Sequence, residues 1–84
     1  MRIRLLSSAS QDLEAGRRSC GRQGEGLGEC FLDSLCSDID SLALYAGIHR
    51  KVFDLRRLLS KRFPYAIYYQ FGTDEVVVYR VMKS

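Results

Sequence analysis

The 84-residue sequence has no tryptophan, one proline, one histidine and three cysteines. It contains no apolar run near the ~20 residues of a membrane-spanning helix. The apolar run that follows the basic start is too short for a signal peptide. We therefore expect a cytoplasmic protein with no membrane attachment. The length leaves room for one domain with a small core, which we place over residues 1–84.

The cysteines do not form an obvious site. Cys20, Cys30 and Cys36 are odd in number, which excludes a complete set of disulfides. Their spacing is not that of a zinc site, and His49 is the only histidine, so we expect no metal and no cofactor. We interpret the thiols as small apolar core residues. The alternative of a redox or nucleophilic thiol finds no neighbouring residue that would activate it.

Residues 7–23, SSASQDLEAGRRSCGRQ, predict a first helix. Asp12 and Glu14 suit the positive end of a first helical turn. Gly16 and Gly21 each cost about 1 kcal/mol relative to alanine, so packing must hold this helix. Its candidate N-terminal caps are Ser7, Ser8 and Ser10. Its weak apolar stripe consists of Ala9, Leu13 and Cys20.

A clearer helical period begins at Leu27 and is expected to end near Gly47, a residue type that suits the position just past a helix. Asp33, Asp38 and Asp40 point away from its apolar stripe. The stripe consists of Leu27, Phe31, Leu35, Ile39 and Leu42, widened by Leu32 and Tyr45. A short glycine-rich link joins the two helices into an αα-hairpin, in which Gly28 permits close backbone approach.

The second half of the chain predicts strands. The four expected strands cover residues 2–6, 51–59, 64–71 and 75–82. Ile3 and Leu5 share one face of the first. In the second, Phe53 and Leu55 face inward and Arg56 faces outward. Pro64 starts the third, where its missing N–H costs least. The segment GTDE, residues 72–75, predicts a hairpin turn. The order β-α-α-β-β-β predicts an α+β fold, with the helical hairpin packed on a small, mostly antiparallel sheet.

Catalytic and phosphate-binding motifs fit poorly. The carboxylates are scattered, and the three serines at the start of the first helix fit capping better than nucleophilic roles. His49 lies beside Arg50 and Lys51 on a connector, where a structural role fits better than catalysis. The segment GRQGEGLGE, residues 21–29, lacks the G-K-[ST] ending of a phosphate loop and follows a helix, so we interpret it as a helix connector.

The net charge of +3 is unevenly distributed. Residues 1–47 carry five cations and seven anions, whereas residues 48–84 carry eight cations and three anions. This bias favours an acidic partner, either nucleic acid or an anionic protein surface, although a solvated basic face is an equally good interpretation. Tyrosines between the cations suit RNA stacking on one strand face and core packing on the other. The basic set is Arg50, Lys51, Arg56, Arg57, Lys61, Arg62 and Arg80.

Three segments together resemble the RelE/ParE superfamily of bacterial toxins, a group that includes plasmid stabilisation toxins. The segments are GLGECFLDSL, HRKVFDLRRLLSKRFPYAIYY and DEVVVYRVM. The resemblance covers about Ile3 to Met82, and RRLLSKRFPYAIYY is its most specific part. It implies a toxin that pairs with a small antitoxin, and a helical hairpin against an antiparallel sheet. Phe63, Pro64, Tyr65 and Tyr69 are assigned mainly to the fold.

The resemblance implies two alternative activities, and particular residues of the sequence favour one over the other. One branch cuts mRNA on the ribosome with cations on the sheet. Arg57 falls near one such position, but Leu59 replaces a second cation and Ala66 replaces the central-strand arginine. The ParE branch poisons DNA gyrase by protein contact, and the sequence fits that branch better. Family members usually continue into a basic tail, whereas this chain stops at Ser84, so we expect an attenuated toxin.

We therefore expect a ParE-like toxin that acts by binding, without catalytic residues. Its expected partners are a cognate antitoxin, DNA gyrase and a second copy of the chain in a homodimer. The residues assigned to partner contact are Arg56, Arg57, Lys61, Arg62 and Arg80. The alternatives are an mRNA interferase of the RelE branch and a non-toxic structural relative.

Overall fold

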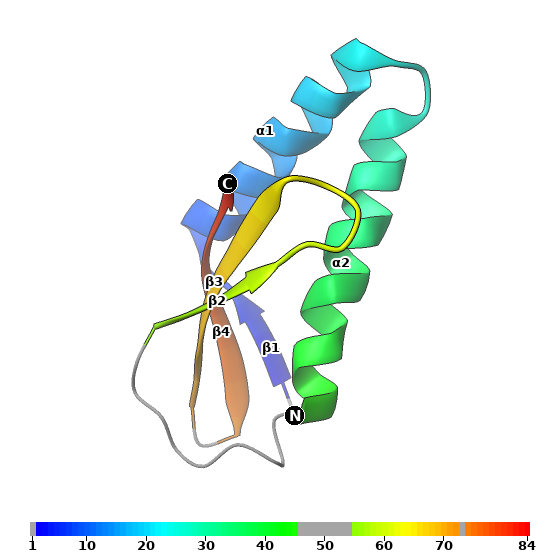
Figure 1. Ribbon diagram of the computed structural model, residues 1–84. Coiled ribbons are helices and arrows are strands. Elements are labelled where there is room, and N and C mark those ends of the chain that lie inside the picture. Colours follow the sequence, from blue (N-terminus) through cyan, green and yellow to red (C-terminus); the bar gives the residue numbers. More distant parts are fainter. Residues whose placement is uncertain (1, 46–54, 73) are drawn as a thin grey trace.

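A helical hairpin packs on a four-stranded sheet in the computed structural model, which describes residues 2–45, 55–72 and 74–84 (Figure 1). The elements are β1 (Arg2–Leu5), α1 (Ser7–Gln23), α2 (Leu27–Tyr45), β2 (Arg56–Leu59), β3 (Tyr65–Phe71) and β4 (Glu75–Lys83). The strand order is β1-β4-β3-β2, with β1 parallel to β4 and the other two pairs antiparallel. The predicted α+β class, the element order and the mostly antiparallel sheet are confirmed.

The core lies between the hairpin and one face of the sheet. Phe31 and Leu35 of α2 are fully buried against Ile67, Val76 and Val78 of the sheet. The predicted α2 stripe is confirmed from Phe31 to Leu42, whereas Leu27 is half-exposed. The Phe31 ring also makes edge-on contacts that hold the loop before β3 against the helices. Its partners are Phe63 and Tyr65, with ring centroids at 5.4 and 4.8 Å.

Two glycines allow the helices to approach closely. A Cβ at Gly16 would overlap the ring of Phe31, and a Cβ at Gly28 would lie 2.9 Å from the carbonyl oxygen of Arg17. The expected role of Gly28 in close backbone approach is therefore confirmed. The helix-weakening glycine at position 16 is explained by the same packing, since only hydrogen leaves room for the aromatic ring.

The start of α1 differs from the prediction. Leu6 occupies the N-cap position without a side-chain cap, and no acidic residue lies in the first turn. Ser8 instead donates a hydrogen bond from Oγ to the carbonyl oxygen of Tyr79, at 2.6 Å. Tyr79 is the bulged residue of β4, because Tyr68 pairs with Arg80 and the next residue pairs with Val78. The serine cap prediction is wrong, because the Ser8 hydroxyl bonds to the backbone of β4 and the start of the helix has no side-chain cap.

Other predictions are also corrected. Leu55 is exposed and not inward, because the alternation of β2 places Leu58 against the core. Arg56 shares the face of Leu58, so it does not point outward as predicted. Of the three cysteines only Cys20 is buried, since the other two lie one residue off the α2 stripe. Asp38 was expected only to point away from the apolar stripe, and the structure shows that it is buried, with hydrogen bonds to the β2–β3 loop.

The predicted second strand, residues 51–59, began too early, since β2 starts at Arg56 and Leu55 lies outside it. Pro64 directly precedes β3, and the predicted turn joins β3 to β4, with the Gly72 N–H donating to the Glu75 carbonyl at 2.7 Å. Predictions about Gly47, His49, Arg50, Lys51, Phe53 and the side chain of Tyr45 lie outside the described residues.

Candidate partner-binding site

The sheet face opposite the hairpin carries the first group of functional candidates, and we name it the open face. Cross-strand pairing aligns Arg57, Tyr68 and Arg80 in one row across β2, β3 and β4. Side chains of directly paired residues stand on the same face, so these three form a cation–tyrosine–cation row. The neighbouring row is apolar. It consists of Leu59, Ala66 and Met82, with Leu59 54% and Met82 46% exposed on either side of the buried Ala66.

Two further arginines reach the open face from the other end of the chain. The parallel pairing of β1 with β4 sets Arg2 beside Glu75 and Arg4 beside Val77. The Arg4 guanidinium lies 3.8 Å from the Glu75 carboxylate, and its side chain is mostly exposed. Sequence reasoning missed both arginines because they belong to the acidic half of the chain. Alternation within RIRLL was the available signal, since it places Arg2 and Arg4 opposite Ile3 and Leu5.

Arg80 is held by an internal partner. Its Nε and Nη2 atoms donate to the two carboxylate oxygens of Asp12, at 2.7 and 3.1 Å. Asp12 also accepts a hydrogen bond from the Val81 N–H at 3.0 Å. The hydrogen bond from Arg80 is the main reason that the pKa of Asp12 lies below its usual range. Arg80 is therefore fixed in place, whereas Arg57 forms no ion pair with any described residue.

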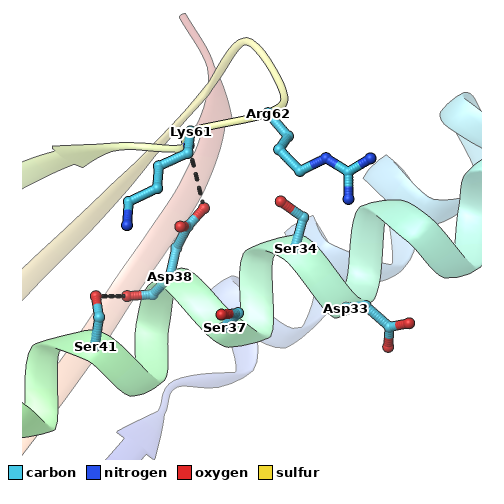
Figure 2. Close-up of a pocket in the computed structure, with 7 residues that line it drawn as sticks. All are labelled: Asp33, Ser34, Ser37, Asp38, Ser41, Lys61 and Arg62. Carbon is cyan, nitrogen blue, oxygen red and sulfur yellow. Dashed lines mark hydrogen bonds between the residues drawn. The ribbon is translucent and has the colours of Figure 1, made fainter.

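Lys61 and Arg62 lie elsewhere, on the loop between β2 and β3. They face α2 across a cavity of about 280 Å³ (Figure 2). The cavity is lined by Asp33, Ser34, Ser37, Asp38, Ser41, Lys61 and Arg62. The loop is anchored by the buried Asp38, whose Oδ2 accepts from Ser60 Oγ at 2.8 Å and from the Lys61 N–H at 3.4 Å. Figure 2 shows Ser34 directed toward Arg62 and Asp33 directed away from the loop.

A smaller, more apolar cavity of about 110 Å³ lies where the hairpin end meets the start of β3. It is lined by Ser19, Cys20, Gln23, Leu27, Phe63, Pro64, Tyr65 and Lys83. Burial raises the pKa of the Tyr65 phenol, so this hydroxyl stays protonated at neutral pH. The floor of this smaller cavity is part of the core, which agrees with the fold role predicted for Phe63 and Tyr65.

The five predicted contact residues therefore do not form one patch. Arg57 and Arg80 meet on the open face, Lys61 and Arg62 line the larger cavity, and Arg56 lies on the helix side of β2. Among the described residues, no three His, Cys, Asp or Glu side chains gather as metal ligands would. Neither of the two helices described is long and apolar enough to cross a membrane.

No protein-family model and no curated protein matches the sequence. A solved structure does match, described as the chromosomal ParDE TA system from P. aeruginosa. The two chains superpose with a TM-score of 0.79 at 17% identity, over 99% of this chain and 95% of the other. The protein therefore shares the fold of that chain, an α+β fold in which the helical hairpin covers one face of the sheet.

Proposed function

We propose that this chain is the toxin component of a type II toxin–antitoxin system, of the ParE-like branch, neutralised by a cognate antitoxin. The observation that carries the proposal is the likeness to a chain of a ParDE system over nearly the full length of both chains. The toxin acts by binding a target such as DNA gyrase, and it does so without catalytic residues of its own.

The open face supports a protein partner. Arg57 lies next to a row whose outer members, Leu59 and Met82, are half-exposed, and Arg2 and Arg4 lie toward the other end of the same face. An acidic, amphipathic antitoxin segment would cover both features together and would fold as it binds. Without that segment the apolar row favours a homodimer. Sedimentation of the free protein at increasing concentration measures this, and a strictly monomeric chain would contradict it.

Ala66 is the residue that argues most directly against an RNA-cleaving activity. It lies on the open face between Leu59 and Met82, near the start of β3, at the position where the resemblance to RNA-cleaving relatives implies a central-strand arginine. An apolar row at that point offers no charge to a scissile phosphate. This row therefore suits protein contact better than phosphate chemistry.

One observation favours a second candidate function, ribosome-dependent mRNA cleavage. The row of Arg57, Tyr68 and Arg80 combines cations with an aromatic ring, which are the groups that contact RNA phosphates and bases. Arg80 is already paired with Asp12. Of the three residues in this row, Arg57 and Tyr68 therefore remain for contacts with RNA.

Expression of the chain alone in bacteria, with and without the neighbouring reading frame, tests the proposal. We expect growth arrest with DNA-damage signalling, relieved when a cognate antitoxin is co-expressed. Arrested translation with mRNA cleavage in an extract would establish the RelE-type activity instead. Normal growth at full protein level, together with no effect on purified gyrase, would identify a non-toxic structural relative and overturn the proposal.

A further inference from the structure

The cavity between α2 and the β2–β3 loop is separate from the open face, and its loop wall is held in place. Ser60 donates its N–H to the Tyr65 carbonyl at 2.8 Å, and its hydroxyl donates to Asp38. The Tyr65 N–H in turn donates to the Phe63 carbonyl at 2.8 Å. These bonds fix the backbone on both sides of Lys61 and Arg62. The backbone that carries the two cations is thus held in place before any ligand arrives, which lowers the ordering cost of binding.

Several donors in this cavity are unused. Within the described ranges, neither the Lys61 ammonium nor the Arg62 guanidinium forms an ion pair, and the hydroxyls of Ser34 and Ser37 donate no hydrogen bond. Ser34 is nearly buried and directed toward Arg62 (Figure 2). The Arg62 guanidinium and the Ser34 hydroxyl form a pair of hydrogen-bond donors that suits an anion, whereas the Lys61 ammonium is directed the other way along α2 (Figure 2).

The carboxylates of the cavity determine which anion fits. The Asp38 Oδ2 atom already accepts hydrogen bonds from Ser60 and Lys61, and the Asp33 side chain points away from the loop. Their two charges still balance Lys61 and Arg62, so the lining is neutral overall. A polyanionic nucleic-acid backbone would bring phosphates next to the aspartates, whereas a single carboxylate at Arg62 adds only one negative charge to the cavity. The volume of about 280 Å³ holds a whole acidic side chain with several waters, each of roughly 30 Å³.

We propose that this cavity binds the carboxylate of one acidic side chain from a partner protein, at the Arg62 guanidinium and above Ser34. The inference rests on the proposed function only in taking the partner to be a protein of the antitoxin kind. It adds a second contact, on the α2 side of the molecule, to the one assigned to the open face.

NMR titration of the isotope-labelled chain tests this inference with two blocked heptapeptides. One carries two glutamates four residues apart, and the other carries glutamines at the same positions. We expect the glutamate peptide to shift the amide signals of Ser34, Lys61 and Arg62, and the glutamine peptide to leave them unchanged. Arg62→Ala should weaken binding at least fivefold. Arg22→Ala, which removes an exposed cation of α1, should change it less than twofold.

Three outcomes would overturn the inference. The glutamine peptide could bind as well as the glutamate peptide, the shifts could fall on the open face instead, or a ten-nucleotide single-stranded RNA could bind these amides more tightly than the peptide. Circular dichroism of each variant shows whether it is folded. The growth assay is independent of these three outcomes. Growth arrest without peptide binding at the cavity would reject only this inference. Peptide binding without growth arrest would reject only the proposed toxin function.

Discussion

Asp12 on α1 accepts a hydrogen bond from the backbone N–H of Val81 on β4, at 3.0 Å. This contact lies where β1 has ended and α1 takes its place beside β4. The Leu6 N–H donates to the Val78 carbonyl at 3.1 Å, and Ser8 donates to the Tyr79 carbonyl one position further. The helix therefore satisfies the polar backbone edge that the short first strand leaves uncovered.

Asp12→Ala should lower the free energy of unfolding by about 1–3 kcal/mol, because the Val81 N–H loses its acceptor and the Arg80 guanidinium loses its partner. Urea denaturation followed by circular dichroism measures the change. Glu14→Ala is the matched control on the same helix, since among the described residues the Glu14 carboxylate pairs with Arg17 and Arg18 of α1 itself. An equal loss in both variants would mean that Asp12 has no special role at the edge.

The same carboxylate predicts how stability depends on pH. The folded pKa of Asp12 lies below its ordinary value of 3.8, so its contribution is complete above that value and is lost as the pH falls through the folded pKa. Denaturation midpoints at pH 7, 5 and 3 should therefore fall less steeply below pH 4 for Asp12→Asn than for the parent chain. Parallel curves would show that this group does not contribute to acid sensitivity.

Two glycines of α1 should respond to alanine with opposite signs. Gly16→Ala places a methyl group inside the Phe31 ring and should cost about 1–3 kcal/mol of stability. Gly21→Ala meets nothing within 4 Å and should stabilise the chain by about 0.5–1 kcal/mol, since alanine favours the helix. Thermal melts of the two variants provide the comparison. Stabilisation by both would show that the hairpin can open to admit the methyl group.

Asp38→Ala should release the β2–β3 loop, because one buried carboxylate oxygen accepts both the Ser60 hydroxyl and the Lys61 N–H. We expect a loss of about 1–3 kcal/mol. Hydrogen exchange at Lys61 should accelerate more than exchange at Val78 in the core. Asp33→Ala, from the exposed face of the same helix, serves as the control and should leave both exchange rates close to those of the parent. If the exchange rate at Lys61 is unchanged in Asp38→Ala, then Asp38 does not anchor the loop.

Local periodicity was sufficient for most of the fold. The stripe from Phe31 to Leu42 and the turn after Phe71 predicted helix 2 and the last hairpin because those signals repeat over short spans. The face of β2 was predicted wrongly because its four residues, RRLL, allow either register and only contact with the core selects Leu58. Asp38 was missed because a buried carboxylate depends on a loop 22 residues away.

The candidate site was harder to predict than the fold. Arg57 was identified from charge, but Arg2 and Arg4 reach the same face only through pairing between the first and last described strands. Lys61 and Arg62 looked continuous with Arg57 along the chain. The loop at Ser60 turns them toward α2 and so divides one basic segment between two surfaces.

The parallel pairing of β1 with β4 also affects the order of folding. Arg2 finds its partner only at Glu75, so the first strand cannot join the sheet before the chain has been synthesised as far as β4. Until then the helical hairpin can form from its own local contacts, but the arginine-rich face does not exist. The open face is therefore complete only after β4 has paired with both β3 and β1.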